Sequence, residues 1–173
     1  MTGELRLVSP TADLQEEYLE ALAEWHKCSE ELSPWSLNMI ADDFASMVER
    51  MNAYREGKKL PEGFVAQSIF WLVDVNLHIL GAIDIRHSLT PFLEHRGGHI
   101  GYGIRPSERG KGYATEMLRL ALVECRKLGM NKVLITCWKS NMASARVIIS
   151  NGGVLESEDL DNGKIFQRYW ISL

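Results

Sequence analysis

The 173-residue sequence lacks several features that would each point to a particular class of protein. No apolar run approaches the ~20 residues that a membrane-spanning helix needs. The opening Met-Thr-Gly-Glu-Leu-Arg has no apolar stretch, so we expect neither a signal peptide nor a membrane partner. Charge of one sign is not in large excess either, because 19 Lys and Arg face 23 Asp and Glu, and this balance gives no support to nucleic-acid binding. Repeats and low-complexity tracts are missing, and a 46% hydrophobic content excludes general disorder.

Cysteine is scarce, with only Cys28, Cys125 and Cys137 along the chain. Because their number is odd, their spacing wide and their neighbours apolar, we expect reduced, mostly buried thiols instead of a disulfide framework. Such thiols are typical of a cytoplasmic protein. The length of the chain favours one domain with one continuous core.

What the sequence does contain is a regular series of apolar periods. A strand at Leu5 to Leu7 is followed by a helix capped by Thr11, and a second helix carries Ile40, Phe44, Met47, Val48 and Met51 on one face. Further on we expect strands at 69–73, 79–83, 99–104 and 133–137, helices at 114–128 and 141–151, and a hairpin around Asn162-Gly163. The helix at 114–128 would act as a crossover that makes its flanking strands parallel neighbours. The predicted fold is therefore a single α/β domain with a mixed, mostly antiparallel sheet flanked by helices.

The chemistry is densest where a strand ends and a helix begins, at Gly110 and Gly112 with Arg109 and Lys111 beside them. Glycines let backbone N–H groups approach a ligand, and a helix N-terminus favours an anion, so this turn is suited to a phosphate. It is not a P-loop, because Lys111 is followed by glycine where a hydroxyl residue is needed. It is also a poor dinucleotide motif, since Thr115 occupies the place of the third glycine.

Arg109-x-x-Gly112-x-Ala114 resembles the acetyl-CoA pyrophosphate motif of the GNAT family of N-acetyltransferases, and Asn141-x-x-Ser144, closed by Gly152-Gly153, resembles the family's second cofactor helix. The likeness is strongest from residue 99 to residue 153, and is nearest to the branch described only as predicted acetyltransferases. It implies one N-acetyltransferase domain over residues 1–173. Residues 1–63 would supply a strand and two helices beside the acceptor site, 64–105 antiparallel strands, 99–153 the acetyl-CoA-binding core and 154–173 a C-terminal hairpin.

The resemblance also implies a set of cofactor contacts. Two splayed parallel strands would receive the pantetheine arm, with Ile104 and Arg105 as backbone partners and the N–H near Ile104 as oxyanion donor. Asn141 would reach the arm from the other side, although it is equally a good helix N-cap, and Ser144 is also explained as a small packing residue. The pyrophosphate would lie on the amides of Arg109, Gly110, Lys111, Gly112, Tyr113, Ala114 and Thr115.

The catalytic residues are less clearly marked. His99 opens the oxyanion strand, where the family often places a base, but a histidine that only hydrogen-bonds at a strand start explains the position equally well. Many members carry a general-acid tyrosine where this chain has Ile148. Either another group such as Tyr102 protonates the thiolate or it leaves unassisted, and an aromatic residue in a strand is more often core. His95 and His99 predict no metal site, because Gly97 and Gly98 oppose the helix that would align them.

The acceptor is marked only by position. Trp35 and the pair Arg86 and His87 are candidates to line its groove, and Arg86 would bind a substrate carboxylate or form a surface salt bridge. The leading prediction is transfer of an acetyl group from acetyl-CoA to a primary amine of a small molecule, a protein N-terminus or a lysine. The alternative is a CoA-binding sensor without turnover. The C-terminal hairpin is compatible with a homodimer.

Overall fold

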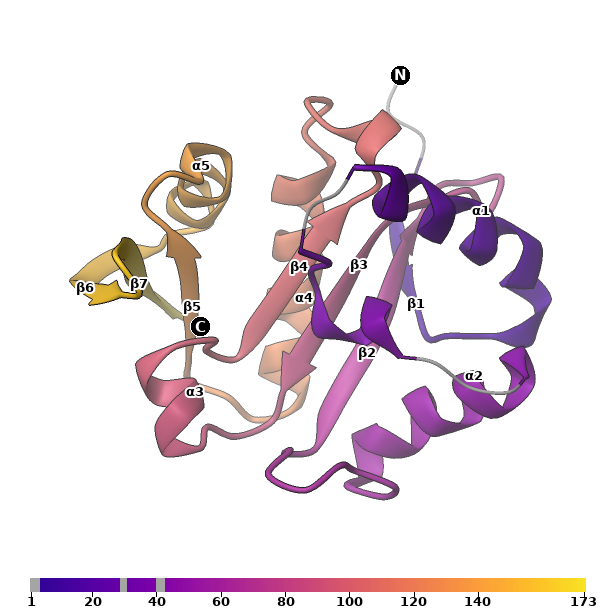
Figure 1. The fold of residues 1–173 in the computed structure, drawn as a ribbon, viewed down its shortest axis with the longest axis horizontal. Coiled ribbons are helices and arrows are strands. Elements are labelled where there is room, and N and C mark those ends of the chain that lie inside the picture. Colours follow the sequence, from indigo (N-terminus) through magenta and orange to yellow (C-terminus); the bar gives the residue numbers. More distant parts are fainter. Residues whose placement is uncertain (1–3, 29–30, 40–42) are drawn as a thin grey trace.

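The computed structural model describes residues 4–28, 31–39 and 43–173, and its strands form two antiparallel sheets (Figure 1). The first sheet has the order β1 (Arg6–Val8), β2 (Gln67–Val73), β3 (Ile79–Arg86) and β4 (Ile100–Ile104). The second has the order β5 (Lys132–Trp138), β7 (Lys164–Ser172) and β6 (Val154–Asp161). The predicted class, an α/β domain with antiparallel strands flanked by helices, is confirmed.

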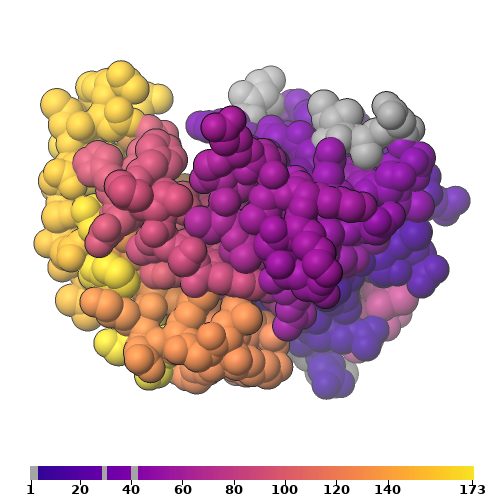
Figure 2. Space-filling model, turned by 90° about the horizontal axis from the view of Figure 1, so that it is seen from below, coloured from indigo at the N-terminus to yellow at the C-terminus, as the bar shows by residue number. Residues whose placement is uncertain are grey.

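Helices cover both faces of the first sheet. The helices α1 (Gln15–Lys27) and α2 (Phe44–Ala53) pack on one face, and α4 (Tyr113–Lys127) packs on the other. On β2, Trp71 stacks on Tyr18 of α1 with ring centroids 4.7 Å apart, while Leu72 belongs to the core cluster that contains Met117 of α4. Burial on both faces explains why these strands are continuous apolar runs. Figure 2 shows the N-terminal segments and the C-terminal hairpin at opposite ends of the molecule.

Local signals for helix ends and turns appear where the sequence places them. The Asn141 side chain caps α5 (Met142–Ser150) by accepting a bond from the Ser144 amide at 3.1 Å. Gly129 follows α4 with a φ of +78°. Asn162 and Gly163 both adopt positive φ between β6 and β7, as a tight hairpin turn requires. Thr11 caps a short 3-10 helix, Ala12–Leu14, that leads into α1.

The strands that flank α4, β4 and β5, are predicted to be splayed parallel neighbours, and no parallel ladder joins them within the described residues. Their one described bridge joins Gly98 to Ile135 and is antiparallel in type, and the His99 amide donates to the Leu134 carbonyl at 2.7 Å. Beyond this point β4 and β5 run in the same general direction but separate (Figure 1). Because β5 pairs with β7 on its other edge, it follows the second sheet and leaves β4. The predicted splay is therefore present, without a parallel ladder.

Two smaller expectations differ from the structure, and a third falls outside the described residues. Residues around Pro91, expected as loop, form α3 (Pro91–His95), which Thr90 caps. Ile40, assigned to the second helix, lies outside the described residues. Cys28 is exposed, Cys137 is half-buried and only Cys125 is fully buried, because the first two lie at a helix end and beside a cavity. Within the described ranges, no helix is long and apolar enough to span a membrane.

Candidate active site

The hydrogen-bond register of β4 turns alternate amides toward the gap between the sheets. The Arg105 amide donates to Leu80 and the Arg86 amide to His99, both across the β3–β4 ladder. In an antiparallel ladder the residues between such pairs direct their N–H and C=O groups to the opposite side. The amides of Tyr102 and Ile104 therefore point away from β3 and toward β5.

This gap opens into a first cavity of about 750 Å³. Its walls come from β4, the turn after it, the start of α4, the end of β5 and the start of α5. Most of the predicted cofactor residues line it: Ile104, Arg109, Gly110, Gly112, Tyr113, Ala114, Thr115, Asn141 and Ser144.

The turn at one end of this cavity is built to receive an anion. Gly110 and Gly112 have φ values of +78° and +85°, and a Cβ on either would meet no protein atom within 4 Å. Because α4 begins directly after Gly112 without a side-chain cap, the first-turn amides lack intrahelical carbonyl partners. The Thr115 amide is the exception, since it donates back to the Gly112 carbonyl at 3.1 Å. The amides of Tyr113 and Ala114 are thus the first-turn donors nearest the open space.

The cationic side chains at this turn have protein partners. Arg109 Nε donates to the Ile104 carbonyl at 3.2 Å, which ties the turn to the end of β4. Lys111 Nζ lies 2.9 Å from a Glu108 carboxylate oxygen, and Lys111 is not among the residues that line the cavity. Backbone donors therefore face the cavity more directly than the lysine charge does.

A hydroxyl pair stands in the middle of the site. Tyr102 Oη lies 2.8 Å from Ser144 Oγ, joining β4 to α5 across the gap. Burial raises the pKa of Tyr102, although the Ser144 hydrogen bond opposes the shift, so the phenol keeps its proton at neutral pH. The sequence favoured core packing for both residues, and no local signal places them together. Ile148, at the family's usual tyrosine position, is fully buried and lies outside the cavity.

A second cavity of about 480 Å³ adjoins the first and shares Tyr102, Ser144, Trp138 and Asn141 with it. Its other walls come from residues 31–38, the end of β3, the segment after α3, and β5. The segment at Ser33 lies directly on β4, since a Cβ on Gly103 would stand 2.0 Å from the Ser33 carbonyl oxygen. Small residues on β4 are thus required for this wall to form.

The Trp35–Asn38 turn is held against the sheet by a buried carboxylate. Asp84 of β3 accepts hydrogen bonds from the Ser36 amide at 2.9 Å and the Ser36 hydroxyl at 2.6 Å. Burial raises the pKa of Asp84 to about 6, because the two Ser36 bonds and the charge of Arg86 offset only part of the desolvation.

Asp84→Asn is expected to change how stability depends on pH. The pKa of Asp84 lies above its ordinary 3.8 only in the folded state, so the folded state binds the extra proton between about pH 4 and 6. Wild-type stability should therefore lose about 3 kcal/mol from this group as pH rises through that window. Asparagine can accept from the Ser36 amide through Oδ1 and donate to the Ser36 hydroxyl through Nδ2, without the charge. Urea unfolding at pH 4 and 7 should show the variant gaining about 2 to 3 kcal/mol on the wild type.

Exposed Asp13 provides the matched control. The difference in unfolding free energy between Asp13→Asn and wild type should not grow in this way between pH 4 and 7. If the difference in unfolding free energy between Asp84→Asn and wild type is the same at pH 4 and 7, the pKa of Asp84 is not raised.

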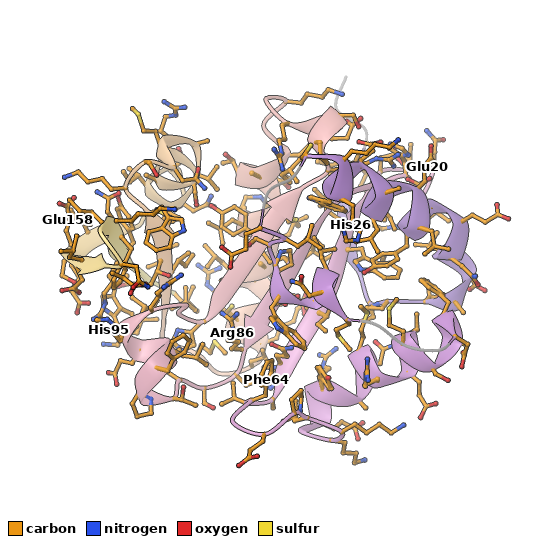
Figure 3. The ribbon with its side chains drawn as sticks, viewed as in Figure 1. Glu20, His26, Phe64, Arg86, His95 and Glu158 are labelled. Carbon is orange, nitrogen blue, oxygen red and sulfur yellow. The ribbon has the colours of Figure 1, made fainter. Side chains whose placement is uncertain are left out.

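Of the three predicted acceptor residues, two line the second cavity. Trp35 forms part of its wall, and Arg86 reaches it from the end of β3 (Figure 3). His87 does not, because successive strand residues point to opposite faces. Its Nε2 lies 2.9 Å from Ser68 Oγ instead.

The contacts of His99 favour the structural explanation over the role of base. Its Nδ1 accepts a hydrogen bond from the Leu134 amide at 2.9 Å, which leaves the proton of the neutral ring on Nε2. Burial, with a further effect of the Arg86 charge, lowers the pKa of His99 to about 4. His99 also lies outside both sets of cavity-lining residues. It fastens β4 to β5 at the point where they diverge.

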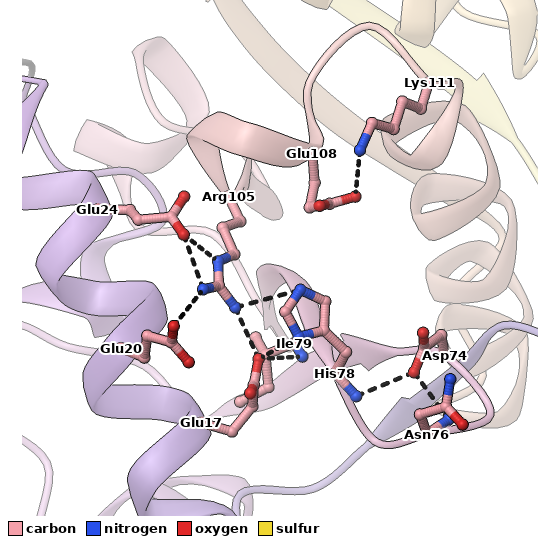
Figure 4. Close-up of polar contacts among 10 residues, drawn as sticks. All are labelled: Glu17, Glu20, Glu24, Asp74, Asn76, His78, Ile79, Arg105, Glu108 and Lys111. Atoms are coloured by element: carbon pink, nitrogen blue, oxygen red, sulfur yellow. Dashed lines mark hydrogen bonds and ion pairs between the residues drawn. The ribbon is translucent and has the colours of Figure 1, made fainter.

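Arg105, predicted as a backbone partner of the pantetheine arm, does not line the first cavity. Its side chain is 3% exposed and lies among the carboxylates of Glu17, Glu20 and Glu24 on α1 (Figure 4). Its backbone is also engaged, because the amide donates to Leu80 and the carbonyl accepts from Glu108. Side chains alternate along β4, so Arg105 takes the face opposite Ile104 and joins the sheet to α1.

The sequence profile of the acetyltransferase (GNAT) domain matches residues 4–154, most of the chain. The chain belongs to the GNAT acetyltransferase family. Solved GNAT structures share its fold. The microcin C7 self-immunity acetyltransferase MccE, solved with acetyl-CoA and AMP, has a TM-score of 0.69 at 18% identity, with 99% of this chain and 97% of that chain covered. No curated protein sequence matches the chain.

Two further solved GNAT structures are of enzymes named for different acceptors. RimL, the ribosomal L7/L12 α-N-protein acetyltransferase in complex with CoA, has a TM-score of 0.68 at 16% identity, covering 98% of this chain and 94% of that chain. The spermidine/spermine N-acetyltransferase SpeG from Vibrio cholerae has a TM-score of 0.64 at 17% identity, covering 97% and 93%. The GNAT fold is thus common to proteins named for unlike acceptors, so the fold alone does not identify an acceptor for this chain. The described residues of this GNAT chain contain no group of three or more metal-ligating side chains.

Proposed function

We propose that this protein is an N-acetyltransferase that transfers the acetyl group of acetyl-CoA to a primary amine. The observation that carries the proposal is the junction of the two cavities, where the amides of Tyr102 and Ile104 point into the gap between β4 and β5. An extended arm in this gap would complete the edge of β4 as an added strand. The second cavity would then hold the amine on the far side of the same junction.

The residues of the first cavity fit acetyl-CoA. The amides that follow Gly110 and Gly112 would accept the pyrophosphate, because open space and positive φ let an anion approach the backbone. Asn141 keeps its side-chain amide group for the arm while its oxygen caps α5. Arg105 and Lys111 are left out of this assignment because the first faces α1 and the second lies outside the cavity.

The reaction joins the amine nitrogen to the thioester carbonyl carbon, and the carbon–sulfur bond breaks. The ammonium gives up one proton to water before attack and the nitrogen loses a second as the amide forms, while the leaving thiolate gains one. The Ile104 amide was predicted as the oxyanion donor, and the Tyr102 amide has the same orientation closer to the junction. The protonated Tyr102 hydroxyl is the donor that the geometry offers to the leaving thiolate.

Most of the N-terminal residues that line the cavities lie outside the two predicted helices. Trp25 of α1 lines the first cavity, and residues 31–38 line the second. The described residues of α2 line neither, and pack on the sheet instead. We assign the acceptor border to the segment between the helices.

Thermal unfolding with CoA, acetyl-CoA, ATP and NAD tests the cofactor assignment. Ligand at about 100 times its Kd should stabilise the fold by about 2.7 kcal/mol, and only the two CoA compounds should do so. Thiol release from acetyl-CoA across a panel of amines and peptides then tests turnover. CoA binding without amine-dependent release would support the sensor alternative, and stabilisation by ATP or NAD alone would contradict both.

A further inference from the structure

Resting on the proposed function, we propose that the amine acceptor also carries a carboxylate, which Arg86 binds. The acceptor class is then amino acids and short peptides with a free carboxylate, and polyamines are excluded. The reaction is the acyl transfer described above, and the carboxylate is unchanged by it.

Hydrogen bonds from one of its two terminal nitrogens hold the guanidinium of Arg86 in a fixed orientation. Nη1 donates to the Gly97 carbonyl at 3.1 Å and to the Gly98 carbonyl at 3.0 Å. The other, Nη2, lies over β4, since a Cβ on Gly101 would stand 3.8 Å from it. Gly101 precedes Tyr102, where the cavities meet, so the guanidinium is held next to the site of attack with a donor directed into the second cavity.

Arg86 forms no ion pair with any of the described residues. Asp84 interacts electrostatically with Arg86, but its two oxygens accept hydrogen bonds from Ser36 and do not form an ion pair with Arg86. The other arginine of the cavity, Arg96, is paired with Asp161 and lies over the Trp138 ring at 4.5 Å. A guanidinium that is half-buried and without a carboxylate partner is suited to a ligand carboxylate, which it can bind through two parallel hydrogen bonds.

The remaining walls fit the rest of such an acceptor. Glu31 lines both cavities and supplies a negative charge for the ammonium group. Trp35 presents an aromatic surface for an apolar side chain, and the mostly buried Phe166 lines the same cavity. A zwitterion with an apolar side chain therefore matches both charges and the walls, whereas a polycation would place positive charge against Arg86.

The test compares acids with their amides. Phenylalanine and glycyl-phenylalanine are each paired with the C-terminal amide, and spermidine is the carboxylate-free amine. Two quantities are measured for wild type: acetylation as kcat/KM, and equilibrium binding in the presence of CoA, which needs no turnover. We expect the acids to exceed the amides by roughly 10- to 100-fold in both quantities, the range of a charge-assisted pair.

Arg86→Gln removes the charge and keeps one donor for the glycine carbonyls, and it should bring the acid-to-amide ratio close to one. Arg119→Gln is the matched control, because Arg119 pairs with Glu116 on α4 and lines neither cavity, and it should keep the wild-type ratio. Wild-type ratios near one, ratios unaffected by Arg86→Gln, or preferred acetylation of spermidine would overturn the inference. Acids that bind more tightly than amides without any acetylation would uphold it while contradicting the proposed transferase.

Discussion

Replacing Gly112 with valine is expected to weaken CoA binding about 100-fold or more. Gly112 has a φ of +85° and stands at the start of α4, with open space where its Cβ would project. A branched side chain cannot hold that backbone conformation without strain, so the turn rearranges and its amides no longer converge. Loss of two hydrogen bonds to a charged group, at about 1.5–3 kcal/mol each, corresponds to this change in Kd. Calorimetric titration with CoA measures it.

Gly129→Val provides the control for backbone strain. Gly129 has a φ of +78° at the opposite end of α4, likewise with no atom near its Cβ position, and lines neither cavity. Both variants should lose stability by about 1–3 kcal/mol, but only the Gly112 variant should lose CoA affinity. Equal CoA affinity in the two folded variants would place the pyrophosphate elsewhere.

Arg105→Ala is expected to destabilise the fold by about 3 kcal/mol. The substitution leaves Glu17 and Glu24, whose side chains are 22% and 26% exposed, without the cation that each contacts at 2.7 Å. Burial opposes ionisation of Glu24, but hydrogen bonds from Arg105 and Ser107 lower its pKa overall. A carboxylate with a lowered folded pKa adds stability above its unfolded pKa, so this contribution is lost as pH falls. The variant should thus differ most from wild type at neutral pH and less in acid.

Urea unfolding is the suitable measurement, because guanidinium salt would screen the charges. Arg119→Ala removes an exposed pair and should cost less than about 1 kcal/mol. Adding Glu24→Gln to Arg105→Ala should recover part of the loss, since the residual repulsion falls. A loss no larger than that of the Arg119 variant would show that the cluster contributes little.

Much of the geometry of the turn at Gly110 and Gly112 could be predicted because its signals are local. Paired glycines before a helix permit positive φ, and glycine has no side chain to cap the first amides of the helix. The Asn141 cap and the Asn162-Gly163 turn likewise depend on residues within a few positions of each other. Arg105 could not be assigned in this way, because its partners lie more than 80 positions earlier on α1. The pairing of His99 with Leu134 is similarly distant in the sequence.

The sequence by itself determined most of the elements and their order, α3 excepted, together with the glycine turn and the family likeness, because periodicity, capping and turn chemistry act over short spans. Tertiary structure alone decided the divergence of β4 from β5, since each strand follows the sheet to which its other edge is bonded. It also decided which charges are available: Arg105 is enclosed by carboxylates, whereas Arg86 is held by two carbonyls beside the junction of the cavities. Charge availability depends on contacts between distant segments, which residue type does not record.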